Sequence, residues 1–352
     1  MLKLNKLIMP IGYSVMRAGR KYRLNKKITN VMTHYKSKGG IIKINNTNEK
    51  IARDLYKKYH ITNLKWHRWY TSVNNMFLPH YIPEDVFYTY IEPVLNRLDL
   101  QKGIDNKNMY DFYFKSLNIK APKTIYRLMN GLLVDEQYQP ILEENIIKPK
   151  KYICKSSIGV GGGHGIYFAS SQDSVGKIIT ILGKDFLAQE IIEQHDAMSV
   201  IHPESVNTVR AISLMLDDEV IILSSVLRVG INGNKVDNQS SGGISAGIWD
   251  NGDVKSVAYS MVGEVFDKHP DTGIQFSSIN IPYFNQIHSI IQKVHPAFSN
   301  FRIISWDFAI GKAEPILIEF NLIWQEINFH QINNGPLYGE YTDEVLKLCS
   351  NP

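Results

Sequence analysis

The chain has 352 residues, of which 44% are hydrophobic and 21% charged, a composition typical of globular proteins with a buried core. Its length allows two or three small domains, and no apolar run approaches the ~20 residues needed to cross a bilayer. The two cysteines, Cys154 and Cys349, are too few for a disulfide framework or a cysteine-based metal site, and no signal-peptide cleavage pattern is visible. These features predict a cytoplasmic protein.

The net charge of +5 is unevenly distributed along the chain. The first thirty residues contain eight basic side chains and no acidic one, whereas the remainder has 31 basic and 34 acidic residues and a net charge of −3. Such a segment indicates contact with an anionic surface, either headgroups at the inner face of a membrane or an acidic polymer, unless it is a solvated helix without a partner. The interleaved aromatic and basic residues of nucleic-acid readers are absent from the sequence, so we expect no nucleic-acid partner. The eight basic residues are Lys3, Lys6, Arg17, Arg20, Lys21, Arg23, Lys26 and Lys27.

Residues 1–104 are expected to form a mainly helical region. Prolines stand at or near predicted helix starts in Tyr81-Ile-Pro-Glu-Asp-Val-Phe and in Ile91-Glu-Pro-Val-Leu. Residues 105–150 predict a small α/β subdomain, with a helix over 108–117 and a strand that opens at Ala121.

From residue 151 to 352 the pattern turns to β-structure. Two long hairpins are expected, and Asn251-Gly252 marks a further hairpin turn. The chain therefore predicts an α+β fold built on hairpins rather than a parallel doubly wound sheet. The expected strands are 152–155, 165–169, 186–192, 208–216, 220–229, 302–310 and 315–320, and the expected helices are 174–182 and 281–294.

A glycine-rich loop, Lys155-Ser-Ser-Ile-Gly-Val-Gly-Gly-Gly-His-Gly165, joins two of these strands. Glycine lets the backbone close over an anion with its N–H groups pointing inward, and Lys155, Ser156 and Ser157 add a positive charge and hydroxyl donors. No Gly-Lys-Ser/Thr opens a helix after the loop, and a strand follows where a dinucleotide-binding fingerprint would have a helix. A glycine loop in a hairpin leaves a protein kinase or an ATP-grasp enzyme, with a flexible surface loop as the alternative.

Oxygen-bearing side chains gather on the last two predicted strands. Glu319 and Asn321 lie two residues apart and project from one face, and the hairpin can bring Asp307 opposite them. Burying three such groups among apolar neighbours is costly without a cation, and Mg²⁺ prefers hard oxygen ligands shared with substrate phosphates. The sequence therefore predicts a magnesium site, the alternative being exposed residues of an edge hairpin. Four histidines show no metal-ligand spacing: His195, His202, His269 and His330.

Taken in order, these motifs resemble the ATP-grasp superfamily, which includes D-alanine–D-alanine ligase and glutathione synthetase. The matching features are Lys107, Lys155 before the glycine loop, the hinge strand Leu-Ala-Gln-Glu-Ile-Ile, Asn207-Thr-Val-Arg210, Asn238 with Gly-Gly behind it, and Asp307 with Glu319-x-Asn321. More narrowly, the chain is similar to the sugar-transfer-associated ATP-grasp family found with bacterial surface-polysaccharide genes. That similarity extends to Tyr81-Ile-Pro-Glu-Asp, Ile91-Glu-Pro-Val-Leu-Asn and Asn334-Gly-Pro-Leu.

The resemblance covers about residues 105–350 and implies two α+β lobes that grip ATP, with a lid subdomain at about 151–190 and a catalytic subdomain at about 191–352. It implies that Lys107 and Lys155 contact the α- and β-phosphates, that Gln189 to Ile192 form the adenine hinge, and that Glu193 or Asn207 holds the ribose. Backbone groups of Glu190 and Ile192 would read the base edge. The implied catalytic residues are Arg210, Arg228 and Asn238. The implied ATP-binding residues are Lys107, Lys155, Ser156, Ser157, Gly161, Gly162, Gly163, Gln189, Glu190, Ile192, Glu193 and Asn207. The implied ligands of Mg²⁺, or of Mn²⁺, are Asp307, Glu319 and Asn321.

Two departures from the family pattern concern the acceptor substrate. Val236 stands where many ligases have an arginine, and Leu322-Ile-Trp-Gln replaces the usual small-residue and proline turn. Three functions therefore remain open: a ligase that joins a carboxylate, such as a uronate or an amino acid, to an amine through an acyl-phosphate; a phosphotransferase acting on a sugar hydroxyl; and a non-catalytic ATP-binding scaffold of a polysaccharide complex.

Overall fold

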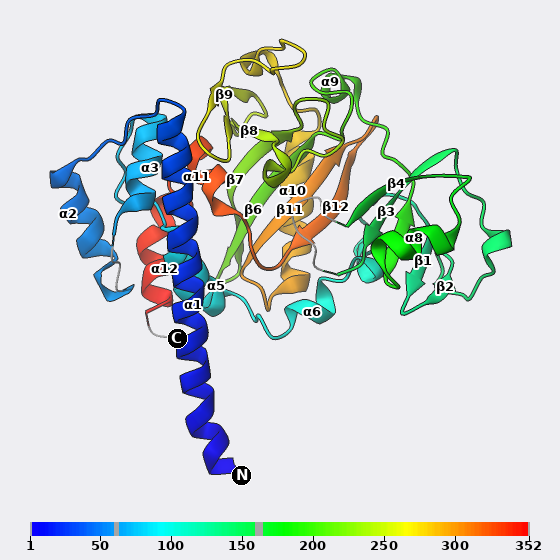
Figure 1. The fold of residues 1–352 in the computed structure, drawn as a ribbon, viewed down its shortest axis with the longest axis horizontal. Helices are drawn as coiled ribbons and strands as arrows, with labels where there is room; N and C mark the ends of the chain where they lie inside the picture. The colour runs from blue at the N-terminus through cyan, green and yellow to red at the C-terminus, as the bar shows by residue number, and fades with distance from the viewer. Residues whose placement is uncertain (1, 60–62, 159–164, 351–352) are drawn as a thin grey trace. The chain divides into compact units, whose positions relative to one another are not determined.

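The computed structural model describes residues 2–59, 63–158 and 165–350, with residues 2–16 and 240 described by their backbone alone. The chain forms two compact units, which are considered one at a time; Figure 1 shows their elements. The first comprises Met1–Arg97, Tyr259–Val265 and Glu326–Pro352, and the second comprises Leu98–Ala258 and Phe266–Gln325.

The first unit is mainly helical, as the sequence predicts. Its longest helix, α1, buries Leu24, Ile28 and Val31, which recur at the spacing of one helix face. Pro83 directly precedes α4, and Pro93 stands in the first turn of α5, where a missing N–H does no harm. Throughout the described ranges, no helix combines the length and apolarity needed to cross a bilayer. The helices are α1 Leu2–Ser37, α2 Asn46–Leu55, η1 Lys57–Tyr59, α3 Lys65–Asn74, α4 Glu84–Val86, the π-helix η2 Phe87–Ile91, α5 Glu92–Leu95, α11 Ile327–Asn334, η8 Gly339–Tyr341 and α12 Thr342–Leu348.

Gln331 ties the carboxyl-terminal segment to the amino-terminal helices of the same unit. Its amide oxygen accepts a hydrogen bond from the Ile82 N–H at 2.8 Å, and its amide nitrogen donates to the Ile82 carbonyl at 2.9 Å and to the Tyr70 hydroxyl at 2.9 Å. Residues 326–352 therefore belong with the helical region, whereas the sequence assigned them to the catalytic subdomain. That assignment followed chain order, and these bonds join residues almost 250 positions apart.

The second unit contains a five-stranded antiparallel sheet in the order β2-β1-β5-β3-β4. Helix α8, Val175–Leu182, packs against β3 and β4, and Ser174 caps it by accepting a hydrogen bond from the Lys177 N–H. Since β1 pairs with β5, the boundary expected at residue 150 falls inside one sheet, and residues 105–150 form no separate subdomain. The strands are β1 Thr124–Met129, β2 Leu132–Val134, β3 Lys151–Ser156, β4 Ile166–Ser170 and β5 Phe186–Gln189.

A seven-stranded sheet in the order β10-β9-β8-β7-β6-β11-β12 contains both predicted long hairpins, β6–β7 and β11–β12. Helix α10, Phe284–Val294, buries Ile287, Ile291 and Val294 in the core of this unit and begins after Tyr283, whose φ of 59° lies outside the helical region. The strands are β6 Thr208–Leu216, β7 Glu219–Val229, β8 Ile244–Ile248, β9 Val254–Ser260, β10 Val265–Phe266, β11 Ile303–Ile310 and β12 Pro315–Asn321. The shorter helices are α6 Gln101–Ile104, η3 Lys107–Met109, α7 Tyr110–Ser116, η4 Glu143–Asn145, α9 Asp196–Ser199, η5 Gln239–Ser241, η6 Phe276–Ser278 and η7 His295–Phe298.

We predict that Gln331→Ala lowers the free energy of unfolding by about 3 kcal/mol, because the Ile82 N–H and carbonyl are then buried without partners. Urea denaturation followed by tryptophan fluorescence reports on this unit through Trp66 and Trp69. The exposed Glu340 offers a matched control, and Glu340→Ala should change the free energy by less than about 0.5 kcal/mol. Equal midpoints for the two variants would contradict the role given to Gln331.

Candidate nucleotide-binding site

One cleft of the second unit is lined by residues from both of its sheets. Ile153 and Lys155 lie two residues apart on β3, so their side chains share the face that looks into the cleft. The seven-stranded sheet contributes Arg228, Asp307 and Glu319. Three connecting segments complete the wall: 190–192, 203–206 and 235–238. The cleft thus combines an apolar side with a dense group of charges, the composition of a small-ligand site.

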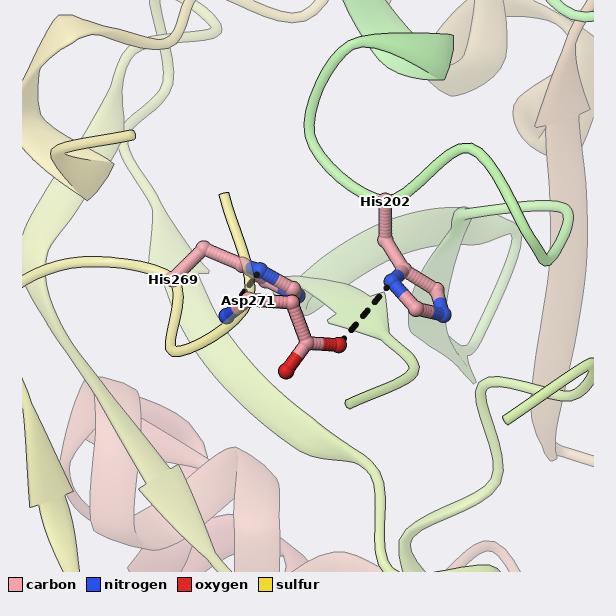
Figure 2. Close-up of side chains that lie close together, drawn as sticks. All are labelled: His202, His269 and Asp271. Atoms are coloured by element: carbon pink, nitrogen blue, oxygen red, sulfur yellow. Dashed lines mark hydrogen bonds and ion pairs between the residues drawn. The ribbon is translucent and has the colours of Figure 1, made fainter. Parts of the chain in front are cut away.

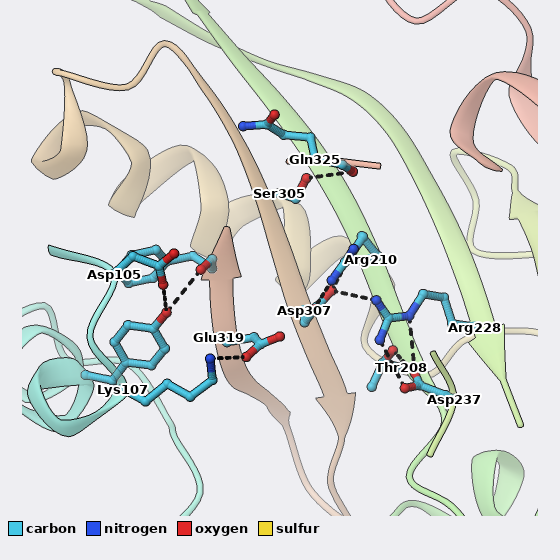
Figure 3. A network of polar contacts seen from close by, with 12 residues as sticks. Asp105, Lys107, Thr208, Arg210, Arg228, Asp237, Ser305, Asp307, Glu319 and Gln325 are labelled. Carbon is cyan, nitrogen blue, oxygen red and sulfur yellow. Dashed lines mark hydrogen bonds and ion pairs between the residues drawn. The ribbon is translucent and has the colours of Figure 1, made fainter. Parts of the chain in front are cut away.

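Lys107 and Glu319 form an ion pair at the edge of this cleft (Figure 3). The Lys107 Nζ lies 3.2 Å from the Glu319 Oε2, and Tyr110 donates a hydrogen bond of 2.5 Å to Asp105 beside them. Burial alone would lower the pKa of Lys107, but the carboxylates of Glu319 and Asp105 outweigh it and raise the pKa above its ordinary value. Lys107 therefore stays charged at neutral pH.

Asp307 is clamped by two arginines from neighbouring strands. Asp307 stands opposite Arg210 in the β11–β6 register, and the Arg210 Nε and Nη2 donate to both of its carboxylate oxygens. The Arg228 Nη1 lies 3.6 Å from the Asp307 Oδ1, and its Nη2 donates to Asp237 at 3.0 Å. Burial would raise the pKa of Asp307, but the two guanidinium groups lower it. The carboxylate is thus held ionised inside the protein.

This clamp corrects one step of the sequence-based reasoning. The sequence suggested that buried oxygens at Asp307 and Glu319 require a metal ion, whereas Arg210, Arg228 and Lys107 already supply the opposite charge. Asp307 and Glu319 nevertheless stand opposite each other in the β11–β12 register, and both line the cleft. Mg²⁺ prefers hard oxygen ligands that it shares with substrate phosphates, and this pair of carboxyl groups in one cleft fits such an ion.

Asn321, the third predicted metal ligand, lies away from the cleft lining. It stands opposite Ser305 in the β11–β12 register and is not among the residues that line the cleft, and its amide nitrogen is buried without a hydrogen-bond partner in the described structure. Asn238 does line the cleft, and its carbonyl accepts hydrogen bonds from the N–H groups of Ser241 and Gly243. The metal and catalytic assignments of these two residues stay predictions.

The two residues expected at the ribose lie elsewhere. Asn207 is fully buried, and its amide donates to the carbonyls of Met198 and His202, so it stabilises the loop beneath the cleft. Glu193 is exposed and faces the ammonium of Lys312 at 3.9 Å. Neither residue lines the cleft in the described structure. The exposed Glu204 does line it and is a carboxylate that the sequence did not single out.

The residues predicted to form the adenine hinge lie partly at the cleft. Glu190 and Ile192 line the cleft, but the Glu190 N–H donates to the Lys123 carbonyl at 2.9 Å and is therefore occupied. Gln189 is buried in β5, where its amide donates to the Pro122 carbonyl. The backbone N–H of Glu190, which the sequence predicted to bind the adenine base, is therefore used in pairing with the chain just before β1.

At the glycine loop, the Ser156 N–H donates to the Gly165 carbonyl at 2.8 Å, and the Ser157 carbonyl accepts from the Lys107 N–H. The Ser157 hydroxyl is buried without a hydrogen-bond partner in the described structure. Gly161, Gly162 and Gly163 lie outside the described residues.

Several residues of the cleft were missed by the sequence analysis. Ile153 could have been found, because strand alternation puts it on the same face as Lys155. Asp237 carried no local signal, since its role depends on Arg228 and on Thr208, which also donates to it. The sequence predicted only strand or loop around Phe168, Lys235 and Ile318, and gave no sign that they line a cleft.

Two α+β lobes that enclose a charged cleft, with Lys155 on one lobe and Arg228, Asp307 and Glu319 on the other, define an ATP-grasp fold. Residues 88–345 match the family described as sugar-transfer associated ATP-grasp, and the chain belongs to this family. No curated protein matches the chain.

Solved structures similar to the chain include three ligases. D-alanine–D-alanine ligase from Helicobacter pylori is 14% identical, with a TM-score of 0.41 over 70% of this chain and 58% of that protein. Phosphoribosylamine–glycine ligase from Thermotoga maritima is 12% identical, with a TM-score of 0.45 over 75% and 59%. L-amino acid ligase from Bacillus licheniformis is 10% identical, with a TM-score of 0.38 over 68% and 47%. The chain spans less than two thirds of the length of each.

Lys155 provides a test of the site through pH. Burial, reinforced by the Lys107 ammonium, lowers the pKa of Lys155 to about 8, although the Glu319 carboxylate opposes the shift. A lysine with this pKa is mostly charged at pH 7 and mostly neutral at pH 9, so we predict that affinity for ATP, measured calorimetrically with Mg²⁺, falls about tenfold over this interval.

In Lys155→Arg the affinity should stay constant between these pH values, because a guanidinium keeps its charge. Lys151→Arg, on an exposed residue of the same strand, should retain the fall. An unchanged pH profile in Lys155→Arg would remove Lys155 from the phosphate site.

Proposed function

We propose that the protein is an ATP- and Mg²⁺-dependent ligase that phosphorylates a carboxylate and joins the resulting acyl-phosphate to an amine. The observation that supports this most is the convergence of Lys155 and Arg228 with Asp307 and Glu319 in one cleft, next to an apolar wall. Charge of both signs suits the handling of phosphate and of the metal that accompanies it.

The apolar side of the cleft suits a nucleotide base. Ile153, Phe168, Ile192 and Ile318 offer surfaces that contact a planar ring, and the neighbouring Glu204 carboxylate is positioned to accept hydrogen bonds from ribose hydroxyls. We assign the ribose to Glu204 in place of Glu193 or Asn207.

The phosphates of ATP would bind at the charged side of the cleft. Lys155 has no carboxylate within ion-pair distance among the described residues, so its ammonium is available to a phosphate. Asp307 and Glu319 would hold Mg²⁺, which would neutralise phosphate charge. Arg228 and, behind it, Arg210 stabilise the negative charge that develops during transfer, and as pre-positioned cations they do so without reorganisation.

A covalent enzyme intermediate is not required by this scheme. Cys154 lies beside Lys155 on β3 but points into the buried core, and burial raises the pKa of its thiol to about 12. Catalysis then rests on alignment of the two substrates and on charge neutralisation. The acceptor end has Val236 in place of an arginine, and we infer that the adjacent Lys235, which lines the cleft, binds the substrate carboxylate.

The family description favours a glycan setting, and we propose a uronate or a small amino acid as the carboxylate substrate in surface-polysaccharide biosynthesis. With Mg²⁺, ATP and pools of such acids, hydroxylamine should intercept the acyl-phosphate as a hydroxamate, accompanied by release of ADP. A stable phosphoester would instead identify a phosphotransferase of sugar hydroxyls, and absence of turnover would identify a scaffold; either result contradicts the ligase.

Glu319→Gln should lower hydroxamate formation about a hundredfold or more, because it removes one of the charges that hold Mg²⁺. Glu314→Gln changes an exposed carboxylate in the turn of the same hairpin and should leave the rate unchanged. Equal rates in the two variants would show that Glu319 is structural.

We also propose that helix α1 brings the protein to an anionic membrane surface. Three of its cations serve packing within the first unit: Arg20 donates to the Tyr88 carbonyl, Lys21 to the Tyr59 carbonyl, and Lys27 pairs with Glu84 at 2.6 Å. Arg17, Arg23 and Lys26 are exposed and supply the charge that supports this proposal.

Vesicles that contain anionic lipid should therefore sediment with the protein at low salt, and neutral vesicles should not. Replacing Arg23 and Lys26 together with glutamine should weaken binding by up to about thirtyfold, since each cation contributes ~1 kcal/mol near such a surface. The same double change at the exposed Lys50 and Lys57 is the control. Equal binding to both kinds of vesicle would contradict the proposal.

A further inference from the structure

Two histidines and an aspartate that are distant in sequence meet beside the nucleotide cleft (Figure 2). His202 follows α9, whereas His269 and Asp271 lie in the loop before η6. One ligand atom from each of the three residues lies within 4.8 Å of the other two, and the two imidazole rings have their centroids 5.3 Å apart. His202 and His269 are fully buried, and Asp271 is more exposed.

Both imidazoles are oriented by backbone carbonyls. The His202 Nε2 donates to the Asn234 carbonyl at 2.8 Å, and the His269 Nε2 donates to the Gly230 carbonyl at 2.8 Å. When Nε2 carries the proton, the Nδ1 of a neutral imidazole presents a lone pair. Imidazole ligands of metals are commonly fixed in this way, with the second nitrogen bound to a carbonyl.

The His202 Nδ1 is the atom that most strongly indicates a cation site. It is buried without a hydrogen-bond partner in the described structure, and it faces the Asp271 Oδ2 at 3.5 Å. A lone pair that faces a carboxylate oxygen is repelled, and a metal ion between the two atoms would remove that repulsion. Among the described residues, the His269 Nδ1 accepts two long contacts, from the N–H groups of Asp271 at 3.3 Å and Thr272 at 3.4 Å, which a metal ion can replace.

We propose that His202, His269 and Asp271 form a site for a zinc-like divalent metal ion. Two imidazoles and one carboxylate match the ligands that Zn²⁺ takes, and water would complete a four-coordinate site. Magnesium and calcium prefer oxygen ligands, which separates this site from the carboxylates of the nucleotide cleft.

The location gives the metal a structural consequence. The carbonyls that orient the two histidines belong to Gly230 and Asn234, and the chain continues from there to residues 235–238 of the cleft wall. Close packing reinforces this contact, because a Cβ at Gly230 would lie 3.0 Å from the His202 Cδ2 and 2.9 Å from the Val236 carbonyl oxygen. A metal ion at the three ligands would therefore hold residues 235–238 of the cleft wall in place.

Cobalt serves as the probe, because Co²⁺ replaces Zn²⁺ and gives visible absorption bands that respond to its ligands. The full-length, chelator-treated protein should bind one Co²⁺ per chain, and Zn²⁺ should displace it with loss of the bands. Asp271→Asn should weaken Co²⁺ binding at least about tenfold, and His202→Gln and His269→Gln should abolish the bands.

The controls separate this site from surface histidines and from the nucleotide cleft. His34→Asn, on an exposed residue of α1, and Glu319→Gln should both bind Co²⁺ as the parent does. If the buried histidine variants fail to fold, Co²⁺ binding by Asp271→Asn, a change at a partly exposed residue, is sufficient to test the proposal. Unchanged binding in Asp271→Asn, or no binding at millimolar Co²⁺, would overturn the proposal.

Discussion

The ion pair between Asp307 and Arg210 organises the charged half of the cleft. Both residues lie on central strands of the seven-stranded sheet, and cross-strand register places them opposite each other. Removing one partner of a buried ion pair typically costs about 3–5 kcal/mol, because the other charge is left without compensation. The same clamp fixes Arg228, which reaches Asp307 on one side and Asp237 on the other. Strand pairing therefore builds the electrostatics of the site into the core of the fold.

This constraint makes the two carboxylates of the cleft unequal, although the sequence presents them as equivalent metal ligands. Asp307 neutralises Arg210 and shares the neutralisation of Arg228 with Asp237, so an uncharged replacement would destabilise the sheet as well as the site. Glu319 is less buried and pairs with Lys107, which a bound metal or phosphate can release into the cleft. A change at Glu319 therefore tests the chemistry with less disturbance of the fold.

Local patterns accounted for much of the fold. Alternating apolar residues and short turns predicted both long hairpins, and the spacing of Asp307 and Glu319 predicted that they stand opposite each other. The errors arose where distant segments meet. The pairing of β1 with β5 erased the boundary expected at residue 150, and the Gln331 bonds moved the carboxyl-terminal segment to the helical unit. The arginine clamp and the Asn207 bonds were equally invisible, because both depend on tertiary neighbours that single-sequence spacing does not encode.

The balance of charge in the cleft bears on the proposed binding of both a metal ion and a nucleotide. Most cations there are already paired: Arg210 with Asp307, Arg228 with Asp237, and Lys107 with Glu319. These pairs neutralise one another within the protein, and under the proposed function a metal ion at the carboxylates would leave Lys107 available to phosphate. Lys155 differs from them, since desolvation lowers its pKa and no carboxylate among the described residues lies within ion-pair distance of it. ATP carries more negative charge than one divalent ion neutralises, so under the proposed function Lys155 would meet that surplus, and the bound phosphate would favour the charged form of its side chain.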